Sequence, residues 1–275
     1  MVWQSVLIGI WKTLIIMSPN LLLVGSGAWG QKYISTLNNF LDIKLTIANR
    51  DNWKALINQK PDGVIVCTPP QSHIEIATYA LEKVIPTMIE KPLAFSLQEA
   101  EMLRQYTAPI LINHIHLFSN RYQYIKQSIA SNDIIHIYSI GTGTNLPRDY
   151  SALWDYGPHD ISMILNLIQQ NPDDIQCKQY NNSFMITMKF GQVETVSLVG
   201  IANRKERVLT INTASFGSIL YDERDLNILP LPLTNALQVF INAIHGKPDY
   251  RLGLDLSLKV MQVLEKCQAC LDNSI

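Results

Sequence analysis

Short apolar runs alternate with amphipathic stretches through the first hundred residues. Runs of strand length occupy residues 21–24, 43–48, 63–68 and 84–89. Between and after them, the spacing of apolar residues predicts helices over 31–40, from 72 onward and from 96 onward, the last opened by a Ser96/Glu99 capping box. This alternation predicts right-handed βαβ units and a parallel sheet, in which ligands bind at the carboxyl ends of the strands.

Beyond residue 109 the pattern changes, and strands follow one another with few helices between them. Strands are predicted at 109–117, 133–141, 175–180, 183–190, 193–201, 208–213 and 217–222, with helices at 121–130 and 161–169 and two more at the end of the chain. The last five strands are joined by short turns, which predicts an antiparallel sheet.

The fold class predicted from these patterns is α/β, in two parts. A Rossmann parallel-sheet domain spans residues 18–117, and a C-terminal α/β domain with an open, mostly antiparallel sheet spans 118–275. Residues 1–17 form an apolar N-terminal extension whose only charge is Lys12. We expect the true start at Met17, with residues 1–16 added by upstream reading. A membrane anchor is the alternative, disfavoured because the stretch is short for a span and lacks a signal-peptide pattern.

Composition narrows the range of partners. The chain of 275 residues is 47% hydrophobic, and its 22 Lys and Arg nearly balance its 23 Asp and Glu. No global charge therefore favours nucleic acid or an anionic membrane. Four cysteines are too few for a disulfide framework, and the single C-x-x-C at Cys267 and Cys270 is poor evidence for zinc. We expect a cytoplasmic protein without a metal.

The first apolar run ends in a G-x-G-x-x-G motif made by Gly25, Gly27 and Gly30. The first glycine allows a tight turn, the second lets a pyrophosphate approach the backbone, and the third lets the next helix pack closely. Ala28 and Trp29 complete the loop, and the helix start that follows favours a phosphate. The strand-turn-helix context favours dinucleotide binding over an ordinary glycine-rich turn.

The end of the second strand bears on which dinucleotide is bound. NAD-binding folds usually carry a carboxylate there, whereas NADP-binding folds tend to offer an Arg to the 2′-phosphate. This chain has Asn49 and Arg50, with Asp51 one position further on. The sequence therefore predicts NAD(P) with a preference for NADP; the alternatives are that Asp51 binds the ribose or that Arg50 is a solvated surface charge.

Three further motifs follow the glycine motif along the chain. Thr68-Pro69 precedes His73, Glu90-Lys91-Pro92 ends the fourth strand, and Asp155-x-x-x-His159-Asp160 begins a helix. With these motifs, the sequence resembles the glucose–fructose oxidoreductase/inositol dehydrogenase (Gfo/Idh/MocA) family from residue 21 to about 271. The resemblance implies an NAD(P)-dependent dehydrogenase or reductase acting on CH–OH groups. It also implies an open C-terminal sheet that forms the interface of a homodimer or homotetramer.

The resemblance assigns roles where positions match. Lys91 corresponds to the lysine that orients the substrate and assists proton movement, and Asp155 and His159 correspond to the family's acid and histidine. Thr68, Pro69 and Glu90 correspond to residues that line the nicotinamide-ribose region, and His73 belongs to the same set of cofactor-binding positions. The substrate implied is a small sugar, cyclitol or sugar nucleotide.

The residues themselves support this chemistry. His159 has an intrinsic pKa suited to removing a hydroxyl proton near neutrality. If Asp155 caps the helix, Pro158 falls in its first turn, and the Asp155 carboxylate can orient the His159 ring four residues on. The alternatives are a structural histidine and a simple capping aspartate. His114 and His116 alternate along the predicted strand, but no third metal ligand stands out. The competing function is a non-catalytic NAD(P)-binding sensor or assembly protein.

Overall fold

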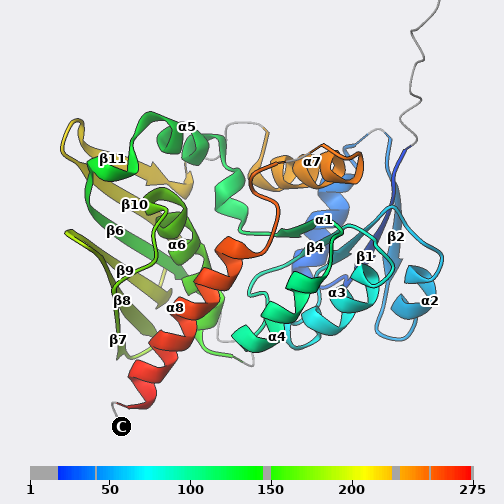
Figure 1. Cartoon of the computed structure of the whole chain (residues 1–275), viewed down its shortest axis with the longest axis horizontal. Helices are drawn as coiled ribbons and strands as arrows, with labels where there is room; N and C mark the ends of the chain where they lie inside the picture. The colour runs from blue at the N-terminus through cyan, green and yellow to red at the C-terminus, as the bar shows by residue number, and fades with distance from the viewer. Residues whose placement is uncertain (1–17, 41, 145–149, 225–229, 248, 274–275) are drawn as a thin grey trace, which may run out of the picture.

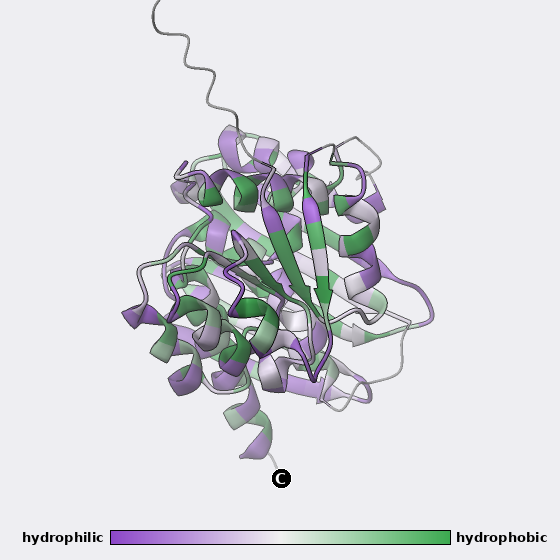
Figure 2. Cartoon of the chain, turned by 90° about the vertical axis from the view of Figure 1, so that its right-hand side faces the viewer, coloured by the Kyte–Doolittle hydropathy of each residue, from purple (hydrophilic) through white to green (hydrophobic). Residues whose placement is uncertain are grey.

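The first half of the chain builds a five-stranded parallel sheet. This computed structural model describes residues 18–40, 42–144, 150–224, 230–247 and 249–273. The sheet has the strand order β2-β1-β3-β4-β5, and every neighbouring pair is parallel. Its strands are β1 (Asn20–Val24), β2 (Lys44–Ala48), β3 (Gly63–Val66), β4 (Thr87–Ile89) and β5 (Ile110–Ile112). Both faces are covered by helices, so the central strands are buried apolar runs (Figures 1 and 2).

The helices between these strands follow from local sequence signals. Ser96 caps its helix, because its hydroxyl oxygen accepts a hydrogen bond from the Glu99 amide at 3.4 Å. The helices of this half are α1 (Ala28–Leu37), α2 (Trp53–Ile57), α3 (His73–Leu81) and α4 (Leu97–Glu101), with 3₁₀ turns η1 (Pro70–Ser72) and η2 (Met102–Gln105). In the described chain, no helix is both long enough and apolar enough to cross a membrane.

A second sheet of six strands follows, with the order β11-β10-β6-β9-β8-β7. Its strands are β6 (Ile134–Gly143), β7 (Asp174–Tyr180), β8 (Ser183–Phe190), β9 (Val193–Ile201), β10 (Glu206–Thr213) and β11 (Gly217–Asp222). Only β6 and β9 pair in parallel; the other pairs are antiparallel. One face packs against α6 (Ala152–Ile168) and α8 (Asp255–Asp272) (Figure 1). The predicted class, a Rossmann sheet plus a mostly antiparallel sheet, is confirmed.

The two sheets share core packing. The helix α7 (Pro232–Ile244) follows the second sheet in sequence but lies against α1, beside the first sheet (Figure 1). A Cβ atom on Gly63 of β3 would come within 2.7 Å of Ile244 and 3.0 Å of Phe240, so these side chains press directly on the strand. Because the hydrophobic core continues from one half into the other, groups from both halves are held in fixed relation.

Two element boundaries differ from the sequence prediction. The strand predicted at 109–117 ends at Ile112, and the chain then forms the 3₁₀ turn η3 (Ile115–Phe118) and the helix α5 (Asn120–Ser128). The helix predicted from residue 161 begins at Ala152, with Ser151 in the N-cap position. Asp155 is therefore not a cap, and Pro158 lies inside the helix. Burial of Ala152, Leu153 and Trp154 extends the helix backward despite the hydrogen bond that a proline removes.

A buried ion pair joins α6 to the second sheet. The Arg207 guanidinium on β10 donates a hydrogen bond to the Asp160 carboxylate on α6, and both side chains are at most 5% exposed. Removing Asp160 leaves the buried Arg207 charge with only the more distant Glu223 carboxylate, 3.9 Å from Arg207 Nε, which costs more than breaking an exposed pair.

We expect Asp160→Asn to lower the free energy of unfolding by about 3 kcal/mol, because Arg207 keeps its charge in a dry environment. Urea denaturation measures the change. The matched control is Asp255→Asn, which breaks the exposed pair between Arg104 and Asp255 and should cost about 1 kcal/mol or less. Equal losses of unfolding free energy in the two variants would show that the buried pair contributes no more to stability than the exposed one.

Candidate active site

The glycine turn adopts the conformation that its sequence suggests. Gly25 has φ +104°, a left-handed conformation, and a Cβ there would lie 2.5 Å from the Cys67 carbonyl oxygen. A Cβ on Gly30 would lie 2.3 Å from the Gly25 carbonyl oxygen. No larger residue fits either position without a backbone shift, so these two glycines hold α1 close to the ends of β1 and β3.

Gly27 has a different environment. No heavy atom lies within 4 Å of the position that its Cβ would take, and Ser26, Gly27 and Ala28 are all exposed. The helix α1 begins at Ala28, so its unpaired backbone amides and the positive end of its dipole face this open space. Such a cradle fits the pyrophosphate of a dinucleotide.

The loop after β2 is ordered by asparagine side chains. The Asn49 side-chain oxygen accepts hydrogen bonds from the amides of Asp51 at 2.9 Å and Asn52 at 3.1 Å. Arg50 and Asp51 are both exposed on this turn, next to the glycine turn because β2 pairs with β1. Asn49 therefore shapes the loop, while Arg50 is the cation that the loop presents.

The Glu90 carboxylate connects the ends of three elements. Its Oε1 accepts hydrogen bonds from Trp29 Nε1, from the Tyr33 hydroxyl and from Asn113 Nδ2, each at 2.6 Å. These donors belong to α1 and to the segment after β5. Burial and the neighbouring Glu90 charge raise the pKa of Tyr33 well above its usual value, so this phenol keeps its proton. Trp29 and Glu90, predicted separately, thus form one buried network.

His73 joins two loops of the same edge. Its Nδ1 lies 3.0 Å from the Pro92 carbonyl oxygen and its Nε2 lies 2.8 Å from the Thr68 carbonyl oxygen, and the side chain is buried. The Thr68 hydroxyl accepts a hydrogen bond from Ser72 at 2.8 Å, whereas Pro69 is exposed. His73 thereby holds the Thr68-Pro69 turn beside the segment that carries Lys91.

Lys91 and Asp155 meet across the two halves of the molecule. The Lys91 ammonium donates hydrogen bonds to Asp155 Oδ1 at 2.9 Å and to the Asp155 carbonyl oxygen at 2.7 Å. The two side chains are only 12% and 17% exposed, so water screens this pair weakly. A lysine at the carboxyl end of β4 is in this way fixed to the first turns of α6.

His159 lies one turn further along α6. Its Nδ1 is buried and has no hydrogen-bond partner among the described residues, so the expected orientation by the Asp155 carboxylate is not made through that atom. The His159 ring instead meets the ring of His116 at right angles, with centroids 4.9 Å apart. Burial and the charges of Lys91 and Arg207 hold the pKa of His159 well below its usual value, so its imidazole is neutral at pH 7.

The structure adds residues that the sequence did not assign to the site. Because β5 ends at Ile112, His114 and His116 do not alternate along a strand: His114 Nε2 lies 2.9 Å from the Ser257 hydroxyl, and His116 Nδ1 lies 2.9 Å from the Tyr221 hydroxyl. Burial and Lys91 lower the pKa of His114 to about 3. Within the described residues, no group of three or more His, Cys, Asp or Glu side chains could hold a metal ion.

Comparison with known proteins agrees with this arrangement. The GFO_IDH_MocA family model, described as an oxidoreductase family with an NAD-binding Rossmann fold, matches residues 39–108. Over these residues the chain is similar to the Gfo/Idh/MocA oxidoreductases.

The individual proteins to which this chain is similar are distant in sequence. A 4-carboxy-2-hydroxymuconate-6-semialdehyde dehydrogenase from Sphingobium sp. (strain NBRC 103272 / SYK-6) is 28% identical over 177 residues, or 51% of this chain. The matched region spans only about half of that relative's length (56%). A solved structure from Magnetospirillum magnetotacticum MS-1 is 25% identical, with a TM-score of 0.80 over 90% of this chain and 99% of that one. Myo-inositol 2-dehydrogenase from Lactobacillus plantarum is 17% identical and shares the fold, with a TM-score of 0.82 over 93% and 98% of the two chains.

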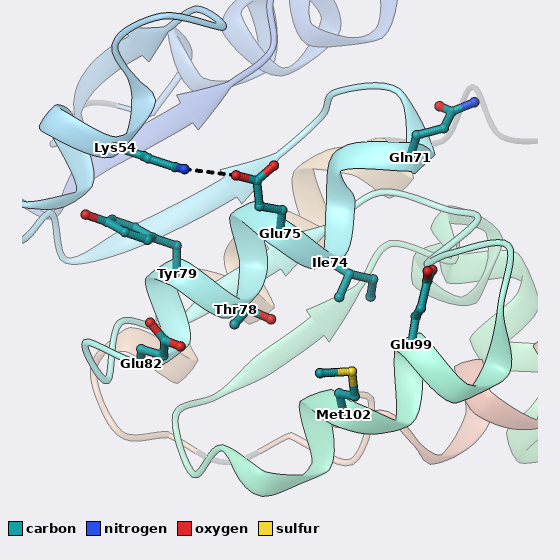
Figure 3. A pocket seen from close by; sticks show the side chains of 9 residues that line it. All are labelled: Lys54, Gln71, Ile74, Glu75, Thr78, Tyr79, Glu82, Glu99 and Met102. Carbon is teal, nitrogen blue, oxygen red and sulfur yellow. Dashed lines mark ion pairs between the residues drawn. The ribbon is translucent and has the colours of Figure 1, made fainter.

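A separate groove of about 460 Å³ lies on the outer surface of the first half of the molecule (Figure 3). It is bordered by α2, α3 and α4, and Lys54 and Glu75 form an ion pair across part of it at 3.0 Å. None of the predicted site residues lines this groove. The candidate active site is therefore the carboxyl edge of the first sheet, where Lys91, Asp155 and His159 converge.

Proposed function

We propose that this protein is an NAD(P)-dependent oxidoreductase that acts on a hydroxyl or keto carbon of a sugar, cyclitol or sugar nucleotide. The observation that carries the proposal is the Lys91–Asp155 bridge, which places an ammonium group and the neutral His159 together at the carboxyl edge of the dinucleotide-type sheet. The dehydrogenases among the relatives, one of them an inositol dehydrogenase, favour a small-molecule substrate.

The residues present fit a dinucleotide. The open space at Gly27 and the first amides of α1 would hold the pyrophosphate, and the Thr68-Pro69 turn would border the nicotinamide ribose. The chemistry that a bound nicotinamide would supply there is hydride transfer to or from the substrate carbon. Glu90 and His73 support this region from within the protein, because their polar atoms already engage neighbouring loops and side chains.

The groups that would move the substrate proton, Lys91 and His159, come from the two halves of the molecule. In the oxidation direction, neutral His159 accepts the proton of the substrate hydroxyl, while Lys91 donates a hydrogen bond to the same oxygen. The Asp155 carboxylate fixes the ammonium in place, so that its orientation is set before substrate arrives. Because the pKa of His159 is lowered, the neutral form needed for this step persists below pH 6.5.

We also propose a preference for NADP, a reducing cytoplasmic location and a homo-oligomer. Arg50 supports the first, because it is exposed on the loop where a 2′-phosphate would lie. All four cysteines are free thiols, which supports the second. The outer face of the second sheet supports the third, because it exposes neighbouring large apolar side chains, namely Tyr138, Ile140, Leu198 and Leu220.

Replacing Lys91 with alanine should lower kcat by about a hundredfold while leaving the dissociation constant of NADPH nearly unchanged, because the ammonium acts on the substrate oxygen. Stopped-flow hydride transfer and nicotinamide fluorescence measure the two quantities. Lys266→Ala, an exposed lysine on α8, is the control and should match the wild type. A sensor would instead show ligand-dependent changes in assembly that survive Lys91→Ala, and would have no turnover to lose.

Replacing Arg50 with alanine should weaken NADPH binding about tenfold, the loss of one charge-assisted contact, and leave NADH binding unchanged. Fluorescence titration with each nucleotide gives both constants. Lys44→Ala removes an exposed cation at the opposite end of the same strand and should change neither. Equal weakening of both nucleotides by Arg50→Ala would contradict the assignment of the 2′-phosphate to Arg50.

Introducing a charge on the sheet face by Leu198→Lys should convert the oligomer to monomers, because an apolar interface does not tolerate an unpaired ammonium. Light scattering coupled to size exclusion gives the mass. Ile47→Lys on β2, which charges an equally exposed apolar position elsewhere, serves as the control. A wild-type protein that is monomeric at micromolar concentration would rule out this interface.

A further inference from the structure

His159 lacks the support that usually orients a catalytic imidazole. A histidine that exchanges protons through one ring nitrogen is normally held by a hydrogen bond at the other. Here Nδ1 of His159 is buried and has no partner among the described residues. Ring packing must therefore supply the orientation, and the ring that packs on it is His116, perpendicular at a centroid distance of 4.9 Å.

His116 is itself firmly held. It lies in η3, immediately after the end of β5, and is 7% exposed. Its Nδ1 lies 2.9 Å from the hydroxyl of Tyr221, a fully buried residue of β11. Burial raises the pKa of this phenol, so Tyr221 stays protonated and can hydrogen-bond a neutral imidazole.

Tyr221 is in turn connected, through Tyr122, to α6, the helix that carries His159. The Tyr221 ring meets the Tyr122 ring edge-on at 6.1 Å. The Tyr122 hydroxyl lies 2.9 Å from the Met163 carbonyl oxygen and 3.0 Å from Asn166 Oδ1, both on α6. A chain of buried rings thus leads from α6 through η3, β11 and α5 back to α6, one turn beyond His159.

From this geometry we infer that His116, fixed by Tyr221, is a positioning residue for His159. The inference rests on the proposed function of His159 as the group that exchanges the substrate proton. His116 need not touch the substrate: its ring blocks rotation of the His159 ring and excludes water from the surface of the His159 ring that it covers. Both effects determine where Nε2 of His159 points and how basic it is, and Nε2 is the ring nitrogen left to contact the substrate.

The charged and titratable groups around His159 come from several elements. Those that face it from other elements are Lys91 after β4, His114 and His116 after β5, and Arg207 on β10, and its own helix carries Asp155 and Asp160. Losing the His116 ring would admit water and relieve the burial that holds the pKa of His159 down. The sign follows directly: the pKa of His159 rises toward its usual value, and the acid limb of the oxidation rate moves to higher pH.

The test compares His116→Leu with His116→Phe in the full chain. The leucine variant keeps an apolar side chain but removes the ring, and we expect kcat for oxidation to fall about tenfold, with an acid limb about one pH unit higher and unchanged KM and NADPH binding. The phenylalanine variant restores a ring without an ionisable group and should recover most of both losses. Tyr221→Phe, which removes only one oxygen atom, should lower kcat and raise the acid limb by smaller amounts than His116→Leu. This variant tests the positioning role of His116 even if the leucine variant folds poorly.

A readout independent of turnover keeps this inference separate from the proposed function. NMR titration of histidine-labelled protein, assigned with His159→Asn, follows the pKa of His159 without substrate. A raised pKa in His116→Leu but not in His116→Phe supports positioning, even where no substrate is turned over. A kcat, pH profile and titration in His116→Leu that coincide with the wild type would overturn the inference, as would a phenylalanine variant as defective as the leucine one.

Discussion

The contact on which the site depends is the ion pair between Lys91 and Asp155. Lys91 ends a strand of the first sheet, and Asp155 lies on the helix that covers the second sheet, so the pair sets the distance between the two halves where substrate would sit. Because both side chains are little exposed, removing one partner would leave the other charge poorly solvated and would be costly. The second bond, to the Asp155 carbonyl oxygen, ties the lysine to the helix backbone as well as to a side chain that can rotate.

A second carboxylate, Glu90, fixes the same end of β4 from which Lys91 projects. Glu90 precedes it and binds side chains from α1 and from the segment after β5. The glycine turn, the strand end with Lys91 and the segment with His114 and His116 are therefore linked through one buried oxygen. This explains how a loop-rich edge can keep a defined geometry: the side chains around Glu90 are hydrogen-bonded to one another before any ligand arrives.

The sequence predicted the elements that depend on local residue patterns, and it missed the boundaries and contacts that depend on packing between distant segments. The strand-helix alternation and the glycine turn were predictable, because the apolar pattern of a strand and the glycine motif of Gly25 and Gly30 can each be recognised from a few consecutive residues. The start of α6 was missed because Pro158 suggests a first turn, whereas burial of Leu153 and Trp154 by distant segments extends the helix past it. Tyr221 carries no local signal: it lies 105 residues after His116 in the sequence and reaches it only because β11 is the edge strand of the second sheet.

The helix α6 gathers these constraints into one element. Asp155 binds the first sheet's Lys91, Asp160 binds Arg207 of the second sheet, and His159 between them packs on His116. Asp155 and His159 lie four residues apart on one face of the helix and Asp160 lies on another, so rotation or sliding of α6 would break at least one of the two charge pairs. Both carboxylates are engaged by cations, and burial together with the charges of Lys91 and Arg207 disfavours the charged form of the intervening imidazole and lowers its pKa. The arrangement therefore keeps His159 neutral and ready to accept a proton, and disfavours its retention once accepted.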